Sequence, residues 1–392
     1  MHTERPEDQL LILIARQSLD IAGAERLRSL VQRDLDWEYL LATAHRHGVL
    51  PLLYYHLNSV CPTLVPRRAM TQLKVDNHEN TRSNLFLTAE LVRLLNLFEA
   101  QGIHAIPFKG PTLALSAYGD VALREFNDLD IFVHKRDVLA VKESLIRQGF
   151  EPYLELSNTQ EAALLLHGNA YGFGCEDTRV WLDIHWAFVR RYFRFELDGD
   201  RLWDRLETIT VAGQQLLTLP PEDLLSVLCV HASKHLWQRL GWISDIAGLI
   251  ERRRDIDWQL VLENAAMLGT RRMLAIGLFL AKELLQAPIP EGVWKTVKAD
   301  RTAIALAEQM HHRLFMERDA PPGHFETALL HARMMERKQD RLRFCLRLAG
   351  TTTVYDWTFV PLPEWLFFLY YLLRPLRLAG KHVVKSLKSG SS

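Results

Sequence analysis

The sequence predicts an α+β protein in which a small mixed β-sheet is flanked by N-terminal and C-terminal helical regions. Apolar and polar residues alternate over 128–133 and 180–186, which is typical of strands. Apolar residues at helical spacing dominate the chain before and after this part. The 392 residues, 48% of them hydrophobic, suffice for two or three domains with sizeable cores.

Three regions are expected along the chain. Residues 1–80 form an N-terminal helical region, 81–215 contain the sheet, and 216–392 form a C-terminal helical domain with an aromatic and basic tail. Gly102 stops the helical run of 81–100, and Pro221 begins the C-terminal helices. The elements expected in the middle region are strands at 104–108, 128–133 and 150–156, helices at 111–118 and 136–148, and a hairpin of 166–173 with 179–186.

Three aspartates in the predicted strands are the candidate catalytic residues. Asp128 and Asp130 are two residues apart, so a strand projects both side chains from the same face. Asp183 alternates in the same way within the second segment and joins them if the two strands are neighbours. Adjacent carboxylates repel each other unless a cation lies between them. The three aspartates are therefore candidate ligands of Mg²⁺ or Mn²⁺, and a pair of such ions serves phosphoryl or nucleotidyl transfer.

Several motifs together resemble a known family. The segments K-G-x-x-L-A-x-x-x-Y from Lys109, R-x-x-x-D-L-D-I from Arg124 and L-D-I-H-W from Leu182 are similar to the bacterial branch called uncharacterised nucleotidyltransferase. This branch belongs to the DNA polymerase β-type nucleotidyltransferase superfamily. The resemblance implies a nucleotidyltransferase core at 81–215. It also implies metal-dependent transfer of an NMP group from an NTP to an acceptor hydroxyl, with release of pyrophosphate.

The same resemblance implies a set of nucleotide-binding residues, namely Lys109, Gly110, Arg124 and Lys234. Gly110 lets the backbone approach the triphosphate. The usual Gly-Ser or Gly-Gly pair is Gly110-Pro111 here, and proline has no N–H to donate. Thr112, Lys109 or the N-terminus of the following helix then supplies that contact. For Arg124, a structural ion pair is the alternative to a phosphate contact.

A second polar cluster lies between residues 231 and 245. On a single helix, i, i+3 and i+4 spacing puts five residues on one face: His231, Lys234, His235, Gln238 and Trp242. Lys234 is expected at the triphosphate, with a histidine near the base, ribose or acceptor and Asp245 holding Lys234 or a histidine in place. A polar contact between helices is the alternative. A zinc site is disfavoured because the H-x-x-x-H pair has no glutamate after its first histidine.

The acceptor, the preferred NTP and the oligomeric state stay open at this stage. A small molecule, a sugar, a peptide, a protein or a tRNA end are all compatible acceptors. A toxin-like modifier of tRNA or protein is one alternative function. A non-catalytic scaffold and a membrane-associated accessory protein are the others.

The composition of the chain bears on where the protein acts in the cell and on which partners it binds. Lys plus Arg and Asp plus Glu both number 47, so the chain is not strongly basic as nucleic-acid-binding domains usually are. The four scattered cysteines and the polar N-terminus favour a cytoplasmic protein. An apolar aromatic run at 365–373 precedes basic residues up to Lys388. Residues 360–388 either contact the inner face of a membrane peripherally or pack on the helical domain.

Overall fold

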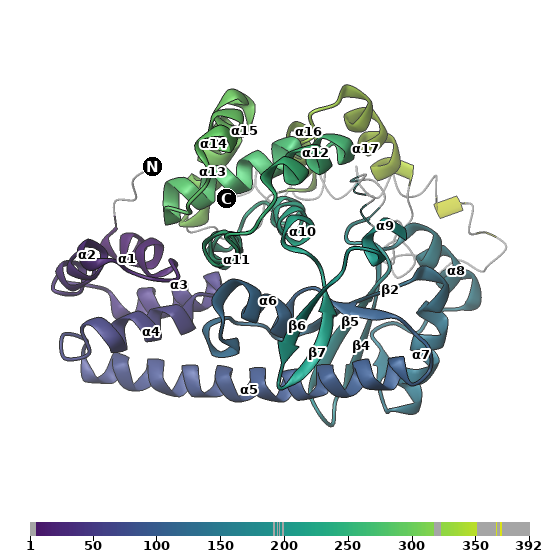
Figure 1. The fold of residues 1–392 in the computed structure, drawn as a ribbon, viewed down its shortest axis with the longest axis horizontal. Coiled ribbons are helices and arrows are strands. Elements are labelled where there is room, and N and C mark those ends of the chain that lie inside the picture. Colours follow the sequence, from purple (N-terminus) through teal and green to yellow (C-terminus); the bar gives the residue numbers. More distant parts are fainter. Residues whose placement is uncertain are drawn as a thin grey trace, which may run out of the picture.

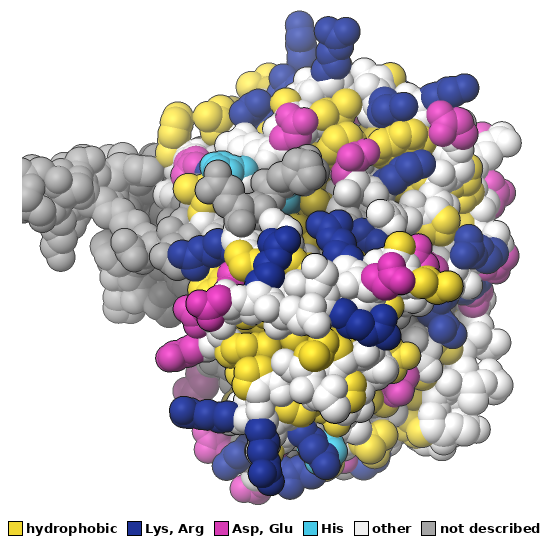
Figure 2. Space-filling model, turned by 90° about the vertical axis from the view of Figure 1, so that its left-hand side faces the viewer, with side chains coloured by type: hydrophobic (Ala, Val, Ile, Leu, Met, Phe, Trp, Pro, Cys, Tyr) yellow, Lys and Arg dark blue, Asp and Glu magenta, His cyan; other side chains and the backbone are white. Residues whose placement is uncertain are grey.

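The computed structural model describes residues 5–190, 193, 195, 197, 200–316, 323–350, 366, 369 and 370. The expected membrane-contacting segment 360–388 lies outside these residues apart from 366, 369 and 370, so its role stays a prediction. Within them, no helix is both long enough and apolar enough to cross a bilayer. Basic and acidic side chains are interspersed over the face that Figure 2 shows.

A five-stranded mixed sheet forms the centre of the protein, as the sequence predicts (Figure 1). Its strands follow the order β1-β2-β5-β4-β3, in which β2 and β5 are parallel and the other neighbours are antiparallel. The strands are β1 (Ala105–Pro107), β2 (Leu129–Val133), β3 (Glu151–Pro152), β4 (Ala170–Cys175) and β5 (Val180–His185).

The two faces of the sheet have different roles. Leu129, Ile131 and Val133 of β2 are buried against α5 (Arg67–Glu99) and α7 (Val138–Arg147). Phe132 belongs instead to the core that the sheet shares with the N-terminal and C-terminal helices. Because side chains alternate along a strand, Asp130 lies on the same face as Phe132 and away from α5. The helical regions therefore cover the face that carries the candidate site.

The helices before and after the sheet share one hydrophobic core. Helix α1 contacts α13, and α6 (Gly110–Tyr118) packs closely on α11. The N-terminal helices are α1 (Pro6–Ile14), α2 (Ile21–Val31), α3 (Trp37–His47) and α4 (Leu50–Val60). The C-terminal helices are α10 (Pro221–Lys234), α11 (Leu240–Arg252), α12 (Trp258–Leu268), α13 (Arg271–Leu285), α14 (Glu291–Ala299), α15 (Arg301–Leu314), α16 (His324–Met334) and α17 (Lys338–Gly350).

Three local features differ from the sequence expectations. The strand expected at 150–156 is reduced to the two residues of β3. Helix α8 (Asn158–His167) follows it, and Ser157 and Gln160 form a capping box at its start. A separate hairpin of β6 (Glu207–Val211) and β7 (Gln214–Thr218) precedes α10, and Ala212 and Gly213 make its turn with positive φ.

Helix α5 has 33 residues and runs below the N-terminal helices and the sheet in the view of Figure 1. The boundary expected near residue 80 falls inside this helix. Its Asn84 side chain is fully buried and donates hydrogen bonds to the carbonyl oxygens of Val121 at 2.6 Å and Arg124 at 2.7 Å. Asn84 therefore fixes the loop that leads through η1 (Val121–Leu123) to Asp128.

We expect Asn84→Ala to lower thermal stability, because the Val121 carbonyl oxygen loses its donor and that of Arg124 keeps only the longer bond from the Asn80 amide at 3.4 Å. The loss is on the order of 1–3 kcal/mol. Thermal unfolding followed by circular dichroism measures it. Asn96→Ala on the same helix is the matched control, since the Asn96 amide makes only an exposed hydrogen bond to Gln214 at 3.3 Å. Equal melting temperatures for the two variants would contradict this role of Asn84.

Candidate active site

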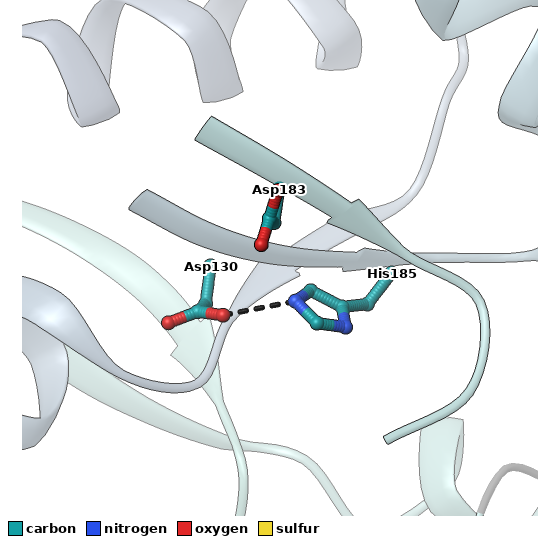
Figure 3. A group of neighbouring side chains, drawn as sticks. All are labelled: Asp130, Asp183 and His185. Atoms are coloured by element: carbon teal, nitrogen blue, oxygen red, sulfur yellow. Dashed lines mark hydrogen bonds and ion pairs between the residues drawn. The ribbon is translucent and has the colours of Figure 1, made fainter. Parts of the chain in front are cut away.

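The parallel pairing of β2 and β5 places two of the predicted carboxylates beside each other. Asp130 is the register partner of Asp183, and both project from the same face of the sheet (Figure 3). Together with His185, their ligand atoms lie within 4.8 Å of one another. Two hard oxygen donors and one ring nitrogen at this spacing are able to hold a divalent metal ion.

Asp130 is the centre of this group. The His185 Nε2–H donates to Asp130 Oδ1 at 2.9 Å, and Lys109 Nζ lies 3.3 Å from both carboxylate oxygens. Burial by itself raises the pKa of Asp130, but Lys109 and His185 outweigh it and hold that pKa well below its usual range. The carboxylate is therefore ionised at all physiological pH values. The other ring nitrogen of His185, Nδ1, is buried and has no hydrogen-bond partner among the described residues.

The other two aspartates are less well compensated. Partial loss of water in the cavity, and then the charge of Asp130, raise the pKa of Asp128, although its surface is still exposed. Burial also raises the pKa of Asp183. His185 lowers this pKa in part, and the charge of Asp130 adds to the rise. Asp128 directly precedes β2, is exposed and lies outside the group within 4.8 Å, although it faces the same cavity. An added cation relieves this mutual repulsion.

A cavity of about 540 Å³ opens between this carboxylate group, the start of α6, and helices α10 and α11. Among the predicted site residues, it is lined by Lys109, Gly110, Arg124, Asp128, Asp130 and Asp183, together with His231 and His235. Lys234 is not part of this lining.

Lys109 and His235, which are 126 positions apart in the chain, both line this cavity. Only the tertiary structure brings these two residues to one cavity, because Lys109 follows β1 and His235 follows α10. The cavity therefore lies between the sheet and the C-terminal helices.

Gly110, at the start of α6, forms part of one side of the cavity. Gly110 has φ +56°, a backbone conformation that favours glycine, and a Cβ there would lie 3.6 Å from the carbonyl oxygen of Asp128. The Thr112 hydroxyl is buried and donates to the Lys109 carbonyl oxygen at 3.0 Å. Of the three predicted sources of a phosphate contact, Lys109 and the first residue of α6, Gly110, line the cavity, whereas Thr112 does not.

Arg124 makes the ion pair that the sequence left as an alternative. Its Nε and one terminal nitrogen donate to the two oxygens of Asp245 at 2.8 and 3.1 Å, and the Tyr118 hydroxyl donates to the same carboxylate at 2.8 Å. The expectation that Asp245 holds Lys234 or a histidine is replaced by this pairing with Arg124 and Tyr118. The pairing links α6, the loop before β2, and α11. A contact between Arg124 and a phosphate stays a prediction.

The cluster of residues 231–242 does not lie on one continuous helix. Helix α10 ends at Lys234, and α11 begins at Leu240. Leu236 and Trp237 have positive φ in the connection, where the Trp237 side chain is fully buried. Gln238 is exposed and outside the cavity lining. The burial of Trp237 accompanies this break, which the helical spacing of the polar residues did not reveal.

The rings of this cluster nevertheless meet in the cavity. The centroids of His231 and His235 are 4.7 Å apart, and Trp242 lies 5.5 and 5.3 Å from them. Burial, followed by nearby cations, lowers the pKa of His235 to about 3 and that of His231 well below its usual value. Both histidines are therefore neutral at pH 7. Burial, then Lys109 and Arg190, lower the pKa of Lys234 to about 8.

Several lining residues were not predicted from the sequence. They come from separate elements, and no pattern in the sequence indicates that they meet at one cavity. These residues are His47, Gly48, Tyr118, Glu125, Tyr153, Trp181, Arg239 and Gly241. Burial raises the pKa of Glu125 to about 7, and Arg239 opposes that rise. His47 Nδ1 accepts a hydrogen bond from the Leu240 N–H at 3.2 Å and so joins α3 to the start of α11.

Comparisons with known proteins gave a similar solved structure and a matching family model. A crystal structure of an antigenic nucleotidyltransferase-like protein from Paracoccidioides brasiliensis is similar at 17% identity and a TM-score of 0.32, covering 53% of this chain and 95% of that one. No curated protein matches the chain. The model of the family described as uncharacterised nucleotidyltransferase matches residues 33–286, which is more than half of the chain. The protein therefore belongs to the uncharacterised nucleotidyltransferase family.

Proposed function

We propose that this protein transfers an NMP group from an NTP to an acceptor hydroxyl in a reaction that depends on a divalent metal ion. The observation that carries the proposal is the pair Asp130 and Asp183, which face a cavity from adjacent parallel strands. Lys109 and the N-terminus of α6 supply positive charge beside them. Carboxylates that bind a metal ion, with positive charge beside them for phosphate groups, suit a metal-bound polyphosphate.

The residues present fit a divalent metal ion. Asp128, Asp130 and Asp183 offer carboxylate oxygens, which are the ligands that Mg²⁺ and Mn²⁺ prefer. Loss of water in the cavity raises the pKa values of Asp128 and Asp183, the charge of Asp130 raises both further, and a bound cation would favour their ionised forms. His185 holds Asp130 through a hydrogen bond, as residues around metal ligands commonly do. When bound, the metal would neutralise phosphate charge and polarise the reacting oxygens.

The triphosphate is expected on the side of Lys109. Gly110 allows the backbone to come close to it, and the free N–H groups at the start of a helix such as α6 favour an anion bound there. Lys234 is buried near Lys109 and adds a further positive charge. Pro111 contributes no N–H, so the contact depends on the neighbouring backbone groups and on Lys109.

The acceptor is expected on the side of Asp183. Its hydroxyl oxygen forms a bond to the α-phosphorus, while the bond from that phosphorus to the pyrophosphate oxygen breaks. The Asp183 carboxylate accepts the hydroxyl proton, which suits a group whose pKa is raised. Positioning and charge neutralisation account for the rest of the rate enhancement.

The other interpretations of the sequence give distinct results. A toxin-like modifier of tRNA or protein is the same chemistry on a macromolecular acceptor, and its expression arrests growth. A scaffold without catalytic activity has no use for the Asp130–Asp183 pair, which speaks against it. We place the protein in the cytoplasm, and a peripheral membrane contact through residues 360–388 remains a proposal. Flotation with liposomes, with and without residues 360–392, tests that contact.

We expect Asp130→Asn and Asp183→Asn to lower nucleotidyl transfer by at least about 100-fold, because each removes a charge that the transition state requires. The measurement uses the four radiolabelled NTPs with Mg²⁺ and cell extract, and follows the label into an extract component. Asp177→Asn in the exposed turn between β4 and β5 is the matched control. Transfer at the wild-type rate by Asp130→Asn would refute the proposed mechanism.

The pH dependence of NTP binding is expected to depend on Lys234. Its pKa of about 8 lies below the usual lysine value, so its charge is present below that pH and lost as the pH rises through it. Affinity for Mg²⁺–NTP should therefore fall between about pH 7.5 and about pH 9.5. Isothermal titration calorimetry at several pH values in this range measures it. Lys234→Met should bind more weakly at pH 7.5 and show a flatter profile.

Lys135→Met, which changes an exposed lysine on η2 (Lys135–Asp137), is the control for that experiment. It should keep both the affinity and the pH profile of the wild type. A Lys234→Met profile as steep as that of the wild type would exclude Lys234 as the titrating group.

A further inference from the structure

Two exposed aromatic side chains form a corner at the mouth of the cavity. Tyr153 and Trp181 both line it and are 48% and 41% exposed. Their ring centroids are 5.9 Å apart, and the planes are inclined by 53°. Large aromatic rings usually bury their faces, so a corner of this kind beside carboxylates is a candidate platform for a ligand ring.

Glycines in β4 make room for this corner. Gly172 is the register partner of Asp183, and Gly174 is the register partner of Trp181. A Cβ at Gly172 would lie 2.2 Å from the Tyr153 ring, and one at Gly174 would lie 2.2 Å from the Trp181 ring. Both rings therefore lie directly against the β4 backbone, where any larger side chain would displace them.

The order of the strands separates this corner from Lys109, the cation next to the carboxylates. Lys109 follows β1 at one edge of the sheet, whereas Tyr153 follows β3 at the other edge. Asp130 and Asp183 lie on the central strands between them. The charged groups that act most strongly on Tyr153 are the carboxylates of Asp183 and Asp128. The cavity thus has a cationic side and an aromatic side with negative potential.

In-line displacement assigns the two sides to different substrates. The attacking oxygen and the leaving pyrophosphate lie on opposite sides of the α-phosphorus. If the triphosphate lies beside Lys109, the attacking hydroxyl enters from the side of Tyr153 and Trp181. This step rests on the proposed function, and it leaves the ring cluster around Trp242 for the nucleoside.

We propose that Tyr153 and Trp181 bind an uncharged sugar ring and present one of its hydroxyl groups to Asp183. Carboxylates only accept hydrogen bonds, and sugar hydroxyls donate them. A nucleobase edge holds acceptors at fixed positions, which these carboxylates leave without a donor, whereas a sugar hydroxyl can rotate to direct its O–H at a carboxylate. A phosphorylated acceptor would be repelled by Asp128 and Asp183. The sugar oxygen then bonds to the α-phosphorus as pyrophosphate leaves, and Asp183 takes the hydroxyl proton.

Saturation-transfer difference NMR with methyl glycosides tests this proposal. The probes are the methyl α-glycosides of glucose, mannose and galactose, each with the wild-type protein, Mg²⁺ and a non-hydrolysable NTP analogue. We expect saturation of the ring protons of at least one glycoside. Trp181→Ala and Tyr153→Ala should weaken binding by at least about fivefold, because each removes a ring-stacking face.

Two further variants separate the corner from general effects on folding. Gly174→Ala keeps both aromatic residues but moves the Trp181 ring, so it should also weaken glycoside binding. Tyr55→Ala removes a 47% exposed tyrosine from α4, outside the cavity lining, and should bind glycosides as the wild type does. Thermal unfolding checks that each variant is folded.

The outcomes distinguish this proposal from the proposed function. If the NTP analogue binds and no glycoside does, or if glycosides bind equally to Trp181→Ala and Gly174→Ala, the sugar assignment is overturned while nucleotidyl transfer stands. If adenosine or a sugar phosphate saturates in place of the glycosides, the assignment is also overturned. Failure of the analogue to bind contradicts the proposed function. In that case, glycoside binding to the wild type that Trp181→Ala weakens would still support the sugar assignment.

Discussion

The parallel pairing of β2 with β5 is the constraint around which the rest of the site is arranged. It holds the Asp130 and Asp183 carboxylates on one face within a group that spans less than 4.8 Å. Two like charges at such a distance repel each other by on the order of 4 kcal/mol at an effective dielectric constant of 20. Lys109 and His185 offset this repulsion at Asp130 but leave Asp183 with a raised pKa. A site with this remaining negative charge is suited to a divalent cation.

The helical regions complete the cavity because they are fastened to the sheet at several points. The carboxylate of Asp245 on α11 accepts hydrogen bonds from Arg124 and Tyr118, so it joins the C-terminal helices to α6 and to the loop before β2. His47 joins α3 to α11 in a similar way. Because a buried ion pair is costly to break, these contacts keep the ring cluster of α10 and α11 opposite the carboxylates.

Strand order also gives the cavity a polarity. The cation that follows β1 and the aromatic corner beside β3 and β5 lie on opposite sides of the central carboxylates. A polyanion and an uncharged ring are thereby favoured at different places in one cavity. This separation is useful for a transfer reaction, since the leaving group and the acceptor have to occupy opposite sides of the reacting phosphorus.

The sequence by itself determined the features that depend on local pattern. Alternation in 128–133 and 180–186 predicted strands that carry Asp130 and Asp183. The sequence also predicted the helix that follows Gly110. Only the tertiary structure decided the pairing of those strands, the ion pair of Arg124 with Asp245, and the corner of Tyr153 and Trp181. Those contacts join residues far apart in the chain, and no local periodicity encodes which distant strands or helices become neighbours.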